Sequence, residues 1–169
     1  MLIYKFTTYG KDFVKSCGMS PDSYVQMALQ LALYKLRQRP SATYEGVSTR
    51  TFLQGRTDSV RCTTSESLSF CRVFESSHSS LDEKEAALRT AVEKHKRAAN
   101  HVTMRCEAVV LPCPYGCYRT YYNIRPDSFI FGLSGSTSGC DKPTALFKEA
   151  LQQSLTEMKE CISSSCPRK

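Results

Sequence analysis

The segment from Pro21 to Gln38 restricts the possible folds of this chain more than any other part of its sequence. Ser20 can cap a helix here, Pro21 suits the first helical position, and Asp22 faces the positive end of the helix dipole. Pro40 cannot continue a helix and closes the segment. Apolar residues occupy most faces of this helix, namely Val25, Met27, Leu29, Leu31, Ala32, Leu33, Tyr34 and Leu36. A helix that is apolar on most sides must be surrounded by protein, so we predict a central buried helix.

Strand and helix patterns on both sides of this segment predict a single α/β domain. The 169 residues suit one compact domain and are too few for two of ordinary size. Ser80 and Glu83 form a capping box that begins a charged helix ending near Ala99. The other predicted helices are a short one after Ser65 and an amphipathic one over Pro143–Ile162. The predicted strands are Leu2–Thr8, Ser41–Leu53, Glu107–Pro112, Tyr118–Ile124 and Ser128–Ser134.

The charge and the cysteine content bear on partners and environment. Lys and Arg outnumber the acids by 23 to 16, and the net charge of +7 favours anionic partners such as phosphates, nucleic acid or an acidic membrane surface. Nine cysteines at irregular spacings favour reduced thiols in an intracellular compartment over a disulfide framework, because the number is odd. No apolar run approaches the ~20 residues that span a bilayer, so we predict no transmembrane segment.

Two stretches contain groups that can bind an anion. Lys11 and Lys15 are four residues apart just before the central helix, where they either hold a phosphate together with helix N–H groups or are simply solvated. The stretch Tyr44–Arg61 contains three arginines and six hydroxyl side chains. It is either a carboxylate or other anion site, or a strand whose arginines pair with its own acids.

The cysteine and histidine patterns point to neither a metal centre nor a catalytic triad. The closely spaced cysteines lack the C-x2-C pair of a zinc site, so we expect no metal ligands; they are Cys106, Cys113 and Cys117. The histidines lie in serine-rich or helical contexts without a G-x-S-x-G elbow, and we expect them to face solvent; they are His78, His95 and His101.

The order of the motifs is more informative than any one of them. "YGKDFVKSCGMSPDSYVQMALQLALYKL" is followed by "ATYEGVSTRTFLQGRTDSVRCTTSES" and then by the charged helix. This collinear series closely resembles the C-terminal half of the carnitine/choline acyltransferase family, and most of all a carnitine O-acyltransferase of the acetyl or octanoyl type. We interpret residues 1–169 as a single partial domain with strong resemblance over 1–104. Residues 105–114 are expected to be an irregular junction, 115–162 the closing strands and C-terminal helix, and 163–169 a tail.

The resemblance implies both a fold and an activity. The fold is the CoA-dependent, chloramphenicol acetyltransferase-like one, an α/β fold with a mixed β-sheet flanked by helices, here as one incomplete domain. The implied activity is acyl transfer between acyl-CoA and carnitine, in fatty acid and acylcarnitine metabolism, with no metal. It also implies an intracellular location in the mitochondrion or peroxisome.

The resemblance further implies two groups of binding residues. The CoA-binding positions are Lys11, Lys15 and Asp22. The hydroxyls that bind the carnitine carboxylate are those of Tyr44 and Thr57, with Glu45, Ser48 and Arg56 as supporting residues. Choline has no carboxylate to satisfy, so the hydroxyl of Thr57 favours carnitine.

The sequence departs from the family at its reactive groups. The family's catalytic histidine belongs to the N-terminal half, and none of the three histidines here matches it, so we assign no catalytic residue. The D-R-H motif and the S-T-S strand that stabilises the oxyanion are absent as well. We therefore expect a chain that needs a missing N-terminal half-domain and is inactive alone. The alternative is a catalytically inactive CoA-binding or regulatory module, and nucleic-acid binding is not expected, because no basic stripe is interleaved with aromatics.

Overall fold

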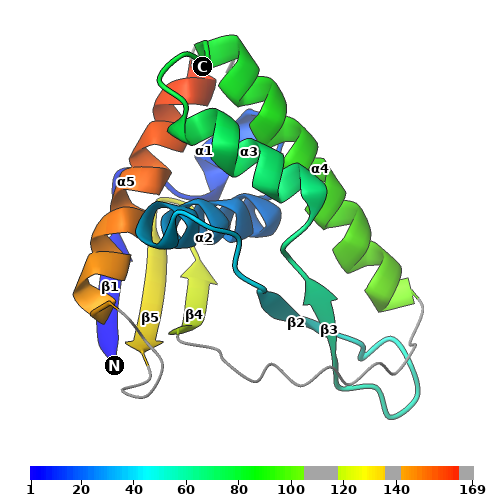
Figure 1. Ribbon diagram of the computed structural model, residues 1–169. Coiled ribbons are helices and arrows are strands. Elements are labelled where there is room, and N and C mark those ends of the chain that lie inside the picture. Colours follow the sequence, from blue (N-terminus) through cyan, green and yellow to red (C-terminus); the bar gives the residue numbers. More distant parts are fainter. Residues whose placement is uncertain (105–117, 136–141, 164–169) are drawn as a thin grey trace.

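The computed structural model of this chain describes residues 1–104, 118–135 and 142–163. Within these ranges five strands and five helices are arranged around one central helix (Figure 1). The strands are β1 (Leu2–Phe6), β2 (Tyr44–Ser48), β3 (Thr57–Arg61), β4 (Tyr118–Ile124) and β5 (Phe129–Gly135). The helices are α1 (Lys11–Ser16), α2 (Pro21–Arg37), α3 (Ser65–Glu75), α4 (Leu81–Met104) and α5 (Thr144–Ser163). The predicted combination of strands and helices is confirmed.

Helix α2 is the predicted central helix, and it crosses the middle of the molecule between α5 and α4 (Figure 1). Ser20 caps it as predicted, because its Oγ accepts the Ser23 N–H at 3.5 Å. At the other end Gln38 has a left-handed φ of 52° and donates its N–H to the Tyr34 carbonyl at 2.7 Å. All residues from 23 to 32 are buried, so the prediction of a buried helix is confirmed.

The described strands form two separate antiparallel sheets. One has the order β1-β5-β4, and the other pairs β2 with β3. The prediction of a mixed sheet was wrong for these strands. The reason is that β4 and β5 are the arms of a hairpin that turns at residues 125–128, while residues 49–56 turn the chain from β2 into β3, and hairpin arms are antiparallel. The predicted strand Glu107–Pro112 lies outside the described residues.

The hydrophobic core surrounds α2 and extends from the three-stranded sheet and α5 to α3 and α4. Phe129 and Phe131 of β5 are fully buried, because alternate residues of this strand face the helices. They belong to one cluster with Tyr24 and Leu31 of α2 and Leu155 of α5. The core thus fixes the position of α2, whose side chains contact both sheets or the residues next to them.

The sequence patterns missed helix α1, which is fixed by contacts distant in sequence. Its first N–H group, that of Lys11, donates to the Arg125 carbonyl at 2.9 Å. A Cβ atom on Gly10 would lie 2.3 Å from the Ser128 nitrogen and 2.5 Å from the Arg125 oxygen, so only glycine fits here. This close approach locks α1 against the turn between β4 and β5.

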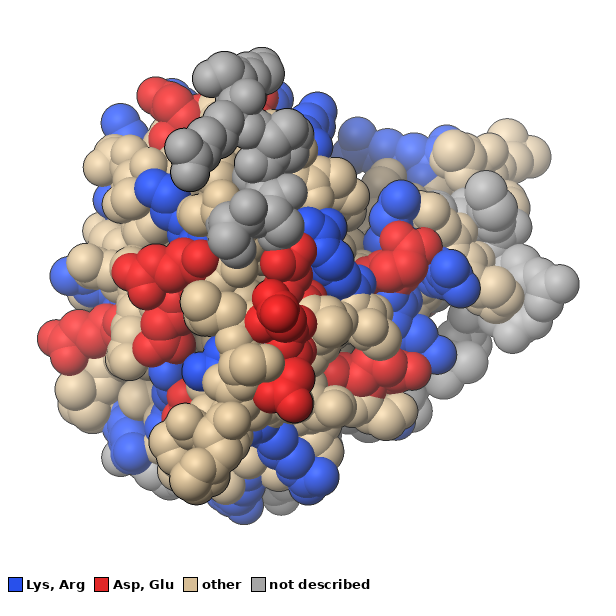
Figure 2. Space-filling model, turned by 90° about the horizontal axis from the view of Figure 1, so that it is seen from above, with Lys and Arg blue, Asp and Glu red and all other residues tan. Residues whose placement is uncertain are grey.

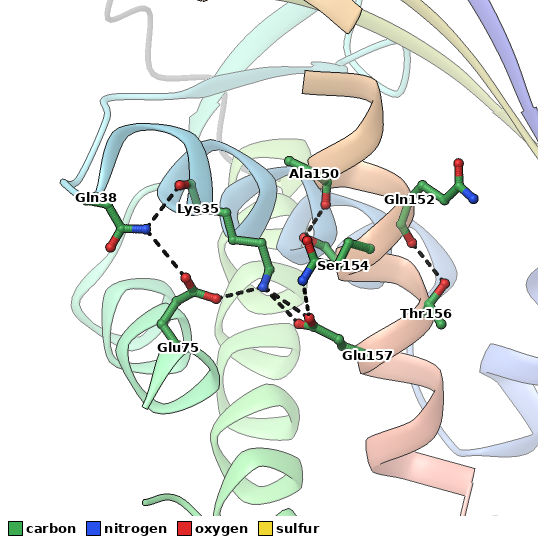
Figure 3. A network of polar contacts seen from close by, with 9 residues as sticks. Lys35, Gln38, Glu75, Ala150, Gln152, Ser154, Thr156 and Glu157 are labelled. Carbon is green, nitrogen blue, oxygen red and sulfur yellow. Dashed lines mark hydrogen bonds and ion pairs between the residues drawn. The ribbon is translucent and has the colours of Figure 1, made fainter. Parts of the chain in front are cut away.

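A network of ion pairs joins α2 to the helices on both sides of it (Figure 3). The Nζ atom of Lys35 lies 2.7 Å from Oε1 of Glu75 and 3.0 Å from Oε2 of Glu157. Only 12% of the Lys35 side chain is exposed. Burial acts to lower the pKa of Lys35, but its hydrogen bonds to the two carboxylates outweigh burial and raise it. The ammonium group therefore stays charged and joins the end of α3 to α5.

Replacing Lys35 by Met is expected to lower the free energy of unfolding by roughly 1–3 kcal/mol. The change leaves two carboxylates facing each other without a cation, and their partial exposure places the loss below that of a fully buried pair. Urea unfolding measures the loss. Lys94→Met is the control, because Lys94 pairs with Glu66 on the surface and should change stability by less than about 1 kcal/mol. Equal, small losses in both variants would contradict a structural role for the Lys35 network.

The structure also bears on two predictions from the sequence, the absence of a transmembrane segment and the reduced state of the cysteines. None of the helices in the described ranges contains a stretch long and apolar enough to cross a membrane. The thiols of Cys62, Cys71 and Cys161 are free, whereas Cys17 is disulfide-bonded, so the expectation of reduced cysteines was wrong for Cys17. Spacing along the sequence does not reveal which thiols a fold brings together.

Candidate functional site

A cavity of about 450 Å³ lies between α2, β2 and β4. Gln26 and Leu29 line it from α2, Tyr44 and Glu45 from β2, and Tyr122 from β4. Its size and its mixture of apolar and polar walls suit a small organic ligand. Two of the residues predicted to form a site, Tyr44 and Glu45, therefore border a real cavity.

The hydroxyl of Tyr122 connects two of the predicted site residues that are distant in sequence. It lies 2.7 Å from Oδ1 of Asp22 and 2.5 Å from Oε1 of Glu45, and it accepts a hydrogen bond from Nε2 of Gln26 at 2.9 Å. A phenol has one proton, so it can donate to only one carboxylate at a time. The other carboxylate must carry a proton of its own to complete its contact.

The environments of the two acids decide which of them carries that proton. Burial, together with the charge of Glu45, raises the pKa of Asp22. Burial also acts to raise the pKa of Glu45, but the neighbouring His95 and Tyr122 outweigh it and lower the pKa. Of the two carboxyl groups, Asp22 therefore keeps its proton to the higher pH, and Glu45 is the better acceptor for the Tyr122 hydroxyl.

Replacing Asp22 by Asn is expected to change how stability depends on pH. A carboxyl whose pKa is raised on folding contributes stability that is complete below its unfolded pKa and is lost as the pH rises through the folded value. Asn keeps a donor for Tyr122 and does not ionise, so the variant should gain stability relative to the parent chain between acid and neutral pH. Urea unfolding at several pH values measures this, with the exposed Asp12→Asn as control. If the stabilities of the parent and Asp22→Asn changed with pH in the same way, the raised pKa of Asp22 would be refuted.

His95 is buried, contrary to the prediction that it faces solvent. Only 2% of its side chain is exposed, its Nδ1 lies 3.1 Å from Oγ of Ser23, and its Nε2 lies 3.2 Å from Oε2 of Glu45. It continues the buried stripe of α4 that contains Leu88 and Val92, so the helical period contained the signal. His78 and His101 are exposed, as predicted.

The hairpin of β2 and β3 presents its predicted carnitine residues on one face. Ser48 pairs with Thr57 across the strands, and Tyr44 lies on the same face because it is an even number of residues from Ser48. Between them Gly46 has no side chain, and the Thr57 methyl lies 3.1 Å from where a Cβ of Gly46 would be. Glu45 points to the opposite face. The structure therefore groups Tyr44 with Thr57 and, separately, Glu45 with Asp22.

The remaining predicted residues lie outside these two groups. Lys11 and Lys15 are four apart on α1, hence on one side of it, and neither forms a hydrogen bond or ion pair with another side chain of the described residues. Arg56 is exposed at the turn before β3. Figure 2 shows one face of the molecule on which acidic and basic side chains are interspersed, so the net positive charge forms no stripe on that face.

Sequence reasoning missed four residues that build the polar group around Glu45: Ser23, Gln26, His95 and Tyr122. Two of them, Ser23 and Gln26, lie within the apolar α2 pattern. Tyr122 lies on β4, 100 residues from Asp22, and no local pattern connects such distant positions.

Comparison with known proteins matches this chain to one family. The model of the family "Choline/Carnitine o-acyltransferase" matches residues 1–109. Choline O-acetyltransferase from Rattus norvegicus is 43% identical over 98 residues, which is 57% of this chain and 15% of the relative. Carnitine O-acetyltransferase from Homo sapiens is 44% identical over 91 residues, 54% of this chain and 14% of the relative. Peroxisomal carnitine O-octanoyltransferase from Bos taurus is 38% identical over 97 residues, 57% of this chain and 16% of the relative. The matches thus span only a small part of each relative.

Proposed function

The chain belongs to the choline/carnitine O-acyltransferase family, and from this premise we propose that it supplies the CoA and carnitine half-site for acyl transfer between acyl-CoA and carnitine. The observation that supports this most is the cavity between α2, β2 and β4, with Tyr44 and Glu45 in its wall and Thr57 on the same hairpin face as Tyr44. Both choline and carnitine acyltransferases are among the relatives, so the proposal of carnitine as the substrate rests on Tyr44 and Thr57.

The proposed CoA-binding residues are Lys11, Lys15 and Asp22. CoA is a polyanion, and two ammonium groups on one side of α1 offset part of its phosphate charge. Asp22 follows a few residues later at the start of α2 and, in its protonated form, can act as a donor as well as an acceptor. We propose no metal in this binding.

The proposed carnitine-binding residues are Tyr44 and Thr57, with Glu45, Ser48 and Arg56 in support. A carboxylate taken out of water needs hydrogen bonds to offset its desolvation. The hydroxyl of Tyr44 in the cavity wall and that of Thr57, exposed on the same face of the hairpin, provide donors for it. Choline lacks this carboxylate, so Thr57 is the proposed basis for preferring carnitine. Glu45 stays on the far side of β2, where its contact with Tyr122 fixes the strand.

The proposed reaction moves an acyl group from sulfur to oxygen. The thioester C–S bond of acyl-CoA breaks, an ester C–O bond forms to the carnitine hydroxyl, and the hydroxyl proton ends on the CoA thiol. A base must move that proton. His95 is enclosed between Ser23 and Glu45, so it is no candidate, and we propose that the base comes from a missing N-terminal half-domain.

The same premise supports proposals about architecture and location. We propose that the two sheets and their helices form part of one CoA-dependent, chloramphenicol acetyltransferase-like domain. We propose a mitochondrial or peroxisomal location, and the similarity to the peroxisomal carnitine O-octanoyltransferase from Bos taurus supports the peroxisome.

Binding of carnitine to the full chain tests the substrate proposal. Tyr44→Phe is expected to weaken carnitine binding about 10- to 100-fold, because a hydrogen bond to a charged group contributes roughly 1.5–3 kcal/mol. Thr57→Val should weaken carnitine binding similarly while leaving choline binding unchanged. Ligand-detected NMR at millimolar concentrations measures both, and Tyr4→Phe on β1 is the control. Equal binding of carnitine and choline by the parent chain would contradict the preference.

A further inference from the structure

A buried group of three potential metal ligands lies where β2, β3 and α4 meet. Glu45 belongs to β2, Cys62 directly follows β3, and His95 belongs to α4. One oxygen, one sulfur and one nitrogen atom of these residues all lie within 4.8 Å of one another. The residue types are those that borderline divalent ions such as Zn²⁺ prefer in proteins.

Two of these atoms lack a hydrogen-bond partner although they are buried. They are Oε2 of Glu45 and Nε2 of His95. The two atoms are 3.2 Å apart, close enough for an ion pair, but their orientation does not make a hydrogen bond between them. Hydrogen bonds weaken steeply when misaligned, so this contact satisfies the two atoms only in part. Apart from this ion pair, neither atom has a hydrogen-bond partner among the described residues, which is costly for buried polar atoms.

The opposite atoms of the same side chains are held by outer hydrogen bonds. Nδ1 of His95 lies 3.1 Å from Oγ of Ser23, and Oε1 of Glu45 accepts from Tyr122 at 2.5 Å. Metal-binding histidines and carboxylates have this kind of outer support, which fixes their orientation. The Cys62 thiol has only a long contact of 3.7 Å to the Val60 carbonyl, so its sulfur is not committed elsewhere.

We propose that Glu45, Cys62 and His95 bind one Zn²⁺-class divalent ion. With bonds of 2.0–2.1 Å to zinc, tetrahedral N and O ligands lie ~3.3 Å apart, close to the spacing observed between His95 and Glu45. On binding, the S–H bond of Cys62 breaks, a metal–sulfur bond forms and the proton leaves to solvent, with no change of oxidation state. The carboxylate and the thiolate together neutralise the ion's charge.

Titration of the metal-free full chain with Co²⁺ tests the proposal. We expect one ion per chain with a thiolate-to-cobalt charge-transfer band, and we expect Zn²⁺ to displace it. Cys62→Ser and His95→Gln should each lose the band and weaken binding at least about tenfold. The matched controls are Cys71→Ser, another buried free thiol, and His78→Gln, an exposed histidine; both should bind as the parent does.

Three results would overturn the proposal: no saturable uptake of Co²⁺, a band that persists in Cys62→Ser or His95→Gln, or equal losses in the control variants. If circular dichroism shows that the test variants do not fold, X-ray absorption of the zinc-loaded parent chain identifies the zinc ligands directly. One sulfur ligand together with imidazole supports the site. Several sulfur ligands, or oxygen ligands alone, would place the ion elsewhere and refute it.

Discussion

Replacing Leu31 by Ala is expected to lower the free energy of unfolding by roughly 2–5 kcal/mol. Leu31 is fully buried near the middle of α2 and belongs to the main core cluster. Removing most of its side chain loses hydrophobic burial and leaves a cavity that helices packed on several sides of α2 cannot close. Urea unfolding monitored by circular dichroism measures the loss.

Leu53→Ala is the matched control for this experiment. Leu53 is 97% exposed at the turn between β2 and β3, so the same chemical change there should alter stability by less than about 0.5 kcal/mol. A loss of under about 1 kcal/mol for Leu31→Ala, or equal losses for the two variants, would contradict the central position of α2.

Replacing Lys11 and Lys15 together by Ala is expected to weaken CoA binding at least about tenfold, a loss of about 1.4 kcal/mol or more. The double change removes two positive charges from one side of α1, where the CoA phosphates are proposed to lie. Lys15 is exposed, so part of its attraction is screened, and the difference between parent and variant should shrink as the salt concentration rises. Isothermal titration at two salt concentrations measures both effects.

The matched control removes the same charge elsewhere. Lys94 and Lys96 are exposed on α4, and changing both to Ala lowers the net charge by the same two units. If binding depended only on the overall positive charge, the two double variants would lose affinity equally. A loss confined to the Lys11 and Lys15 pair is what a local phosphate site predicts.

The sequence predicted α2 well because its signals are local. The cap at Ser20 and the apolar pattern through Leu36 lie within a few turns of one another, and the structure confirms the start, the end near Arg37 and the burial. Helix α1 was missed because its position depends on the contact of Gly10 with Ser128, more than a hundred residues away. Local patterns contain no information about such approaches.

The sheet arrangement could not be derived for a related reason. Strand pairing depends on which segments meet in space, and the stretch predicted as one strand over Ser41–Leu53 is β2 followed by a turn that brings β3 back beside it. That register places Tyr44 and Thr57 on one face. The resemblance named both residues, but only the pairing shows that the Thr57 methyl packs closely beside Gly46.

The polar group around Glu45 contains one residue whose burial the sequence could have revealed and one contact that it could not. His95 could have been recognised as buried, because it lies three residues after Val92 and seven after Leu88 on α4. Its polar side chain and helical context led instead to the prediction that His95 faces solvent. The contact of Tyr122 with Asp22 had no comparable signal, since the two lie on elements that only the tertiary fold brings together.

Titration of CoA into the purified full chain tests whether this chain contributes a CoA and carnitine half-site. We expect saturable binding of one CoA per chain, weakened at least about tenfold by the Lys11 and Lys15 double change and unaltered by the Lys94 and Lys96 double change. No binding at millimolar CoA, or the same loss of affinity in both double variants, would contradict it.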